Sequence, residues 1–267
     1  MQLPRVVARE EWLAARKRLL IQEKQATRAR DALNAARRGL PMVRVDKDYQ
    51  FEGPALRVEA AGAPARESRS DPRPAQKETL LQLFAGRRQL IVCHVMFFPE
   101  QGQACTGCSL TVDNLPHLAH LHARETSLVV VSRAPLEQLA RFQQRMGWNI
   151  PWYSSLGCDF NYDFHATSDE AVAPVEYNYR DKATLERLGQ SYHVSGEQPG
   201  VSVFVRDDEA VFHTYSTYGR GLDILENTNN YLDLTVFGRG EGWGGMPDVH
   251  GLGRHWLRHH DRYGSRE

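Results

Sequence analysis

The stretch QLIVCHVMFFPEQGQACTGCSL, residues 89–110, decides the fold of this 267-residue chain. Apart from Gln89 and His94, its first nine residues are apolar, which is typical of a strand covered on both faces of a sheet. A Cys-x-x-Cys pair, Cys105 and Cys108, follows and opens a helical pattern. The stretch therefore predicts a dithiol at the N-terminus of a helix, shortly after a buried strand.

Strand and helix patterns alternate on both sides of this stretch. Upstream, 42–51 predicts a strand and 79–84 a short helix. Downstream we expect a helix over 109–123, a buried strand over 127–132, a helix over 135–146, a hairpin of 201–205 with 210–215, and a helix over 221–231. This order indicates an α/β fold with a central mixed sheet flanked by helices.

The length suits one core with additions better than two separate domains. We expect a helical extension over residues 1–40, a single domain over 41–238 and a tail over 239–267. Residues 60–77, AAGAPARESRSDPRPAQK, contain few large apolar side chains and many Pro, Ala, Arg and Ser residues. That composition predicts an inserted, mobile surface loop.

The region 8–38 lacks Pro and Gly, which predicts one long helix. Trp12, Leu19, Ala26 and Leu33 recur every seven residues and form one modestly apolar seam. Residues 1–40 hold ten Lys and Arg against four Asp and Glu, as a nucleic-acid or membrane arm would. Because interleaved aromatic residues are missing, we favour a helix that packs on its own domain or on a twin chain in a homodimer, anchored by Trp12.

Charge and cysteine content limit the classes of function. Lys+Arg and Asp+Glu are equal at 33 each, so no overall field steers the chain toward nucleic acid or an anionic membrane. The N-terminus lacks the apolar stretch of a signal peptide, and no apolar run is long enough to cross a bilayer. We expect a soluble, cytoplasmic protein whose four cysteines serve redox or metal chemistry rather than a disulfide framework.

The dithiol predicts thiol-disulfide chemistry. Unpaired N–H groups and the helix dipole stabilise a thiolate at Cys105, whereas Cys108 lies one turn inside and is shielded. Cys105 would attack a protein or small-molecule disulfide, and Cys108 would resolve the mixed disulfide. His94 is either a core histidine or the proton acceptor of Cys108. Cys93 and Cys158 are expected to be small buried apolar residues.

A metal site is the competing interpretation, since half of a zinc site has the same Cys-x-x-Cys spacing. No second Cys-x-x-Cys exists, and the histidines near the dithiol are His94, His117, His120 and His122. The alternative function is then a non-enzymatic binding or scaffold protein with zinc at these cysteines. His255 and His259 are one helical turn apart, but no carboxylate motif accompanies them. Nucleotide-binding glycine patterns are absent, so we expect no cofactor.

Six segments resemble one bacterial family: RVDKDYQFEGP (44–54), LFAGRRQLIVCHVMF (83–97), CTGCS (105–109), LVVVSRAP (128–135), MGWNIPWYSSLGCDFNYDF (146–164) and HTYSTYGRGLDILENTNNYLDLT (213–235). The family is catalogued as domain of unknown function 899, in the thioredoxin superfamily and related to peroxiredoxin-like proteins. The resemblance implies a thioredoxin-like fold with Cys105 and Cys108 where thioredoxins carry their dithiol. It names no reaction.

Two positions depart from the relatives of that family. Thioredoxins place a proline directly before a strand opposite the dithiol, and here Pro199 stands one residue early if the strands are aligned by their turn. Peroxiredoxins require Thr three residues before the peroxidatic Cys and Pro four before that. Cys105 and Gln101 occupy those places, which counts against peroxidase chemistry of that type.

Overall fold

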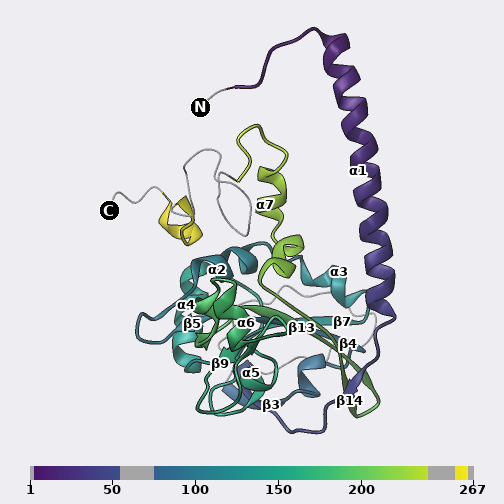
Figure 1. Cartoon of the computed structure of the whole chain (residues 1–267). Helices are drawn as coiled ribbons and strands as arrows, with labels where there is room; N and C mark the ends of the chain where they lie inside the picture. The colour runs from purple at the N-terminus through teal and green to yellow at the C-terminus, as the bar shows by residue number, and fades with distance from the viewer. Residues whose placement is uncertain (1–2, 55–74, 240–255, 264–267) are drawn as a thin grey trace.

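The computed structural model describes residues 3–54, 75–239 and 256–263 (Figure 1). Its centre is an eight-stranded sheet with the order β1-β14-β13-β4-β7-β8-β2-β3. In chain order these strands are β1 (Val43–Arg44), β2 (Gln50–Pro54), β3 (Ala75–Thr79), β4 (Gln89–His94), β7 (Thr126–Ser132), β8 (Trp152–Ser154), β13 (Gly200–Asp207) and β14 (Ala210–Tyr218). β4 and β7 are parallel, as are β7 and β8, whereas β13 runs antiparallel to β4. The predicted α/β fold with a central mixed sheet is confirmed.

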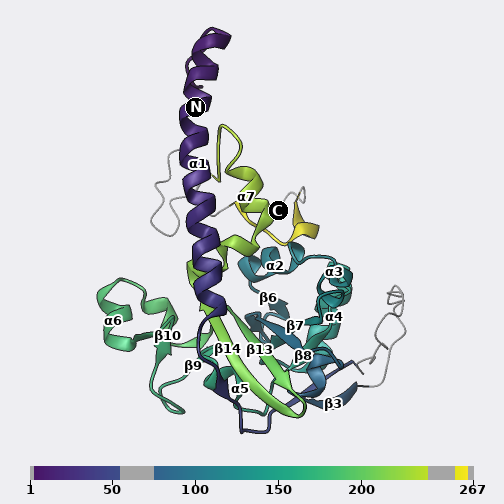
Figure 2. The ribbon, with the colours of Figure 1, turned by 90° about the vertical axis from the view of Figure 1, so that its right-hand side faces the viewer.

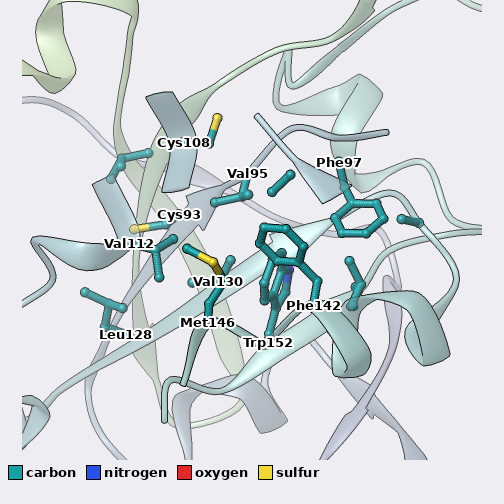
Figure 3. Packing of buried hydrophobic residues seen from close by; sticks show 14 of the residues in the cluster. Cys93, Val95, Phe97, Cys108, Val112, Leu128, Val130, Phe142, Met146 and Trp152 are labelled. Atoms are coloured by element: carbon teal, nitrogen blue, oxygen red, sulfur yellow. The ribbon is translucent and has the colours of Figure 1, made fainter. Parts of the chain in front are cut away.

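Helices cover both faces of this sheet. They are α1 (Arg9–Arg38), η1 (Gln82–Phe84), α2 (Thr106–Asp113), α3 (Leu118–His122), α4 (Leu136–Met146), α5 (Phe160–Asp163), α6 (Lys182–Arg187), η2 (Ser191–His193), η3 (Gly219–Leu225), α7 (Asn227–Leu232) and η5 (His260–Arg262). On one face, Val112 of α2 and Phe142 of α4 pack with Cys93 and Trp152 of the sheet (Figure 3). On the other face, Phe160 of α5 and the residues of η1 close a second core.

Three short strand pairs lie outside the large sheet. They are β5 (Phe97–Phe98) with β6 (Gln103–Ala104), β9 (Thr167–Ser168) with β12 (Gly196–Glu197), and β10 (Glu176–Tyr177) with β11 (Arg180–Asp181). The first of these pairs matters for function, because it carries the chain from the end of β4 to the cysteines.

Several predicted elements have different bounds in the structure. The expected strand over 42–51 is two strands, of which β1 pairs with β14 and β2 with β3 and β8. The expected helix over 109–123 is divided into α2 and α3, because Pro116 between them cannot donate a helical hydrogen bond. The expected loop over 60–77 lies outside the described residues up to position 74, and its last three residues begin β3.

Helix α1 extends away from the body instead of lying across it (Figures 1 and 2). None of its residues is buried, and the side chain of Trp12 is 53% exposed. The prediction that Trp12 anchors this helix to its own domain is therefore wrong. The helix is attached only at its C-terminal end, where the guanidinium of Arg37 lies over the ring of Tyr215 in β14. Within the described ranges, no helix combines the length and apolarity needed to cross a membrane.

The packing of Gly53 against Tyr153 gives a direct test of the sheet. A Cβ atom at Gly53 in β2 would come within 2.1 Å of the ring of Tyr153, which is fully buried in β8. We predict that Gly53→Ala lowers the free energy of unfolding by about 1 to 3 kcal/mol, because the ring must leave its position. The measurement is urea denaturation followed by circular dichroism.

The matched control is Gly39→Ala at the end of α1, where the nearest atom to a new Cβ is the carbonyl oxygen of Ala36 at 3.4 Å. Stability of this variant should stay within about 0.5 kcal/mol of the wild type. Equal stability of both variants would show that β2 does not pack on β8 as described.

Candidate functional site

The dithiol is positioned by the end of β4 and the hairpin of β5 with β6. The backbone N–H of Cys105 donates to the carbonyl of Met96 at 3.0 Å, which ties the chain after the hairpin to the chain after β4. Cys105 is the N-cap of α2, and its carbonyl accepts the N–H of Ser109 at 2.8 Å. The predicted position of Cys105, at the start of a helix that follows a buried strand, is confirmed.

The two cysteines come within 4.2 Å of each other. Cys105 is partly exposed, whereas Cys108 is only 5% exposed and packs in the core between α2 and the sheet (Figure 3). Both are free thiols. An accessible thiol beside a shielded one is the arrangement that a two-step disulfide exchange needs, since one sulfur must meet the substrate and the other must reach only its neighbour.

Contacts around Cys108 favour its protonated form. Its hydrogen bond with Cys105 raises the pKa of the Cys108 thiol, and burial and the charge of Cys105 add to this, while a hydrogen bond with the backbone of Met96 lowers it. The nearby carboxylate of Glu226 raises this pKa further. Cys108 is thus held as a neutral thiol until a proton acceptor or a nearby disulfide changes its surroundings.

Glu226 is a site residue that sequence reasoning missed. It lies between η3 and α7, is 7% exposed, and accepts a hydrogen bond from Thr111 of α2 at 3.2 Å. Asn229 donates to its other oxygen. A single glutamate in the segment LDILENTNN has no local pattern that marks it, because only the docking of this segment on α2 brings it near Cys108.

His94 does not lie beside the cysteines. Neighbouring residues of a strand face opposite sides, and Cys93 faces the core of Cys108 while His94 stacks on Phe160 in the other core. Its Nε2 lies 2.9 Å from the hydroxyl of Ser202, and burial lowers the pKa of His94 to about 3. The structure therefore does not bring His94 to Cys108, and the interpretation of His94 as a core histidine fits its position.

The remaining candidate ligands are also dispersed. Cys93 belongs to one core and Cys158 contacts the other, so these two cysteines lie on opposite faces of the sheet. Burial raises the pKa of Cys93 to about 12, as suits an inert buried thiol. Among the described residues, no group of three or more His, Cys, Asp and Glu is placed to hold a metal ion.

The described part of the C-terminal segment, residues 256–263, lies next to the dithiol loop. Nε2 of His259 is 2.9 Å from the carbonyl oxygen of Ala104, the residue before Cys105. Nδ1 of His260 is 2.8 Å from the carboxylate of Asp113 in α2. These histidines therefore make contacts with the start and the end of the dithiol segment, while His255 lies outside the described residues.

Pro199 lies at the same edge of the sheet as the dithiol loop. It directly precedes β13, whose first residue, Gly200, pairs with His94 at the end of β4. Alignment by the turn had placed Pro199 one residue too early, because it ignored that β13 begins at Gly200. The carbonyl of Pro199 accepts a hydrogen bond from the hydroxyl of Tyr177 at 2.9 Å, which fixes this approach to the strand.

A polar cluster around Glu197 occupies this edge as well. Both carboxylate oxygens of Glu197 lie 3.0 Å from the hydroxyl of Thr167, and the amide of Asn161 donates to one of them at 3.3 Å. Burial raises the pKa of Glu197 to about 7, although Thr167, the charge of Arg133 and Asn161 each oppose the shift. The sequence gave no signal for this cluster, because its members come from four separate elements.

These features define a class of protein. A parallel β4–β7 pair, an antiparallel β13–β14 hairpin next to β4, and a dithiol at the helix after β4 make up a thioredoxin-like fold. The chain belongs to the family described as bacterial protein of unknown function, DUF899, which matches residues 1–62 and 73–263. The unmatched residues 63–72 fall within the stretch 60–77 that we interpret as an insertion.

Other comparisons add little. The solved structures include a mutant of PrxQ from Xylella fastidiosa, at 11% identity and a TM-score of 0.35, over 58% of this chain and 83% of that one. This likeness is too weak to support an argument about chemistry. No curated protein matches the chain.

The raised pKa of Glu197 predicts a pH dependence of stability. With an ordinary pKa near 4.5 in the unfolded chain and about 7 in the fold, the fold binds more protons between these pH values. Its contribution to stability is therefore present below pH 4.5 and is lost as the pH rises through 7. Relative to wild type, Glu197→Gln should gain roughly 1 to 3 kcal/mol of unfolding free energy between pH 5 and pH 8.

Urea denaturation at the two pH values measures this gain. Glu209→Gln, at the exposed turn between β13 and β14, is the control and should follow the wild type. If Glu197→Gln also follows the wild type at both pH values, Glu197 is ionised in the fold and the cluster is solvated.

Proposed function

We propose that this protein is a cytoplasmic thiol-disulfide oxidoreductase that uses Cys105 as nucleophile and Cys108 as resolving thiol. The observation that supports the proposal best is the approach within 4.2 Å of a partly exposed and a buried cysteine at the start of α2. The substrate is a disulfide that can reach Cys105. The direction of net electron flow depends on the reduction potential of the pair.

The exchange proceeds in two steps. The thiolate of Cys105 attacks one sulfur of the substrate disulfide, so that the substrate S–S bond breaks, a mixed disulfide forms and one substrate sulfur leaves as thiolate. Cys108 then gives up its proton and attacks the sulfur of Cys105, which releases the second substrate sulfur. The substrate gains two electrons and two protons, and the protein is left with a Cys105–Cys108 disulfide that a dithiol reductant reduces again.

The local structure assigns a role to each neighbour in this scheme. The free N–H groups at the start of α2 and its dipole favour negative charge on Cys105. Glu226 and the apolar core keep Cys108 protonated until the mixed disulfide has formed, which limits premature ring closure. His94 has no part in the reaction, since it faces the other core.

Serine variants test the two roles of the cysteines. Cys105→Ser should reduce dithiol-dependent cleavage of a generic disulfide substrate to the background rate, because the attacking sulfur is lost. Cys108→Ser should instead accumulate a mixed disulfide between Cys105 and the substrate, which mass spectrometry detects as an added substrate mass. Cys158→Ser, which changes a partly exposed cysteine in the other core, is the matched control and should retain activity.

Equal activity of the wild type and both dithiol variants would contradict this function. Stoichiometric zinc in the purified protein, lost on Cys105→Ser, would favour a binding or scaffold protein with a metal at the same cysteines.

A further inference from the structure

Helix α1 presents an apolar seam that nothing in the described part of its own chain covers. Its 30 residues span about 45 Å. The side chains of Trp12, Leu19 and Leu33 are all about half exposed, and no residue of the helix is buried. Isolated helices of this kind are marginal in water, so the seam needs an apolar surface to pack against.

A second exposed apolar surface lies on the η3–α7 segment of the same chain. Ile224, Tyr231, Leu234 and Val236 are all more than half exposed, and Leu234 reaches 84%. Four large apolar side chains in 13 residues are an unusual concentration for a free surface. We call this the 224–236 surface.

The charges of the two parts are complementary. Residues 1–40 carry ten Lys and Arg against four Asp and Glu, and the rest of the chain carries 23 against 29. The helical extension is therefore positive by six charges and the remainder negative by six. Such a balance favours contact between the extension and the body of another copy, and it disfavours two extensions side by side.

The position of α1 prevents it from reaching the body of its own chain. The pairing of β1 with β14 fixes the chain just after the helix at one edge of the sheet, and Arg37 on Tyr215 fixes the last turn. From there α1 runs outward past the body, as both views show (Figures 1 and 2).

We propose that two copies of this chain form a twofold dimer in which α1 of each copy packs on the 224–236 surface of the other. Such a reciprocal contact satisfies both apolar surfaces of both copies. A helix face of about 45 by 10 Å presents roughly 450 Å². Two such faces and their two acceptors total about 1,800 Å², close to a standard interface of roughly 1,600 Å², whereas pairing of the helices alone gives only about half that area.

Sedimentation equilibrium of the full chain over micromolar concentrations tests the dimer. The wild type should be dimeric, and Leu19→Glu in the seam or Leu234→Glu in the acceptor should each raise the dissociation constant at least tenfold. Gln25→Glu adds the same charge to α1 but lies about 240° around the helix from Leu19, so it should remain dimeric. Because all three side chains are exposed in the single chain, circular dichroism and disulfide cleavage should match the wild type.

Mixing the two disruptive variants tests the reciprocal contact itself. A mixed dimer of Leu19→Glu and Leu234→Glu chains keeps one unaltered contact, so the mixture should recover dimer that neither variant forms alone. A monomeric wild type would overturn the proposal, whether or not it binds duplex DNA or anionic vesicles through α1. A dimer that survives Leu234→Glu would overturn the assigned acceptor and indicate pairing between the two α1 helices.

Discussion

The double pairing of β4 is the constraint on which the rest of the structure depends. This strand is bonded to the parallel β7 on one side and to the antiparallel β13 on the other, and four of its six residues are buried. Its alternation directs Cys93 and His94 to opposite cores, and its end directs the chain through Met96 into the hairpin that returns to Cys105. The location of the dithiol is therefore a consequence of this one strand.

The chemistry of the dithiol depends on contacts from distant parts of the chain. Glu226 approaches Cys108 because the segment after β14 docks on α2, and His259 contacts the carbonyl of Ala104. A buried thiol near a carboxylate is costly to ionise, so Cys108 stays neutral while Cys105 remains accessible. This difference between two neighbouring sulfurs separates the roles of nucleophile and resolving thiol.

Sequence patterns predicted what local structure determines. Continuous apolar runs predicted β4 and β7, helical spacing predicted α4, and the resemblance predicted the family. The side on which His94 lies, the carboxyl groups of Glu197 and Glu226 and the exposure of Trp12 depend on which elements pack together, and no local pattern carries that information. The single strand expected over 42–51 failed for the same reason, since its two halves pair at opposite ends of the sheet.

The central claim is that Cys105 and Cys108 form a reversible disulfide within one chain. Equilibration in glutathione redox buffers, acid quenching, alkylation and mass spectrometry measure it directly, and give the reduction potential of the pair. The account predicts a two-electron transition that joins Cys105 to Cys108 and leaves Cys93 and Cys158 as thiols. A chain that stays fully reduced under oxidising conditions, or that only accumulates glutathione on Cys105, would contradict it.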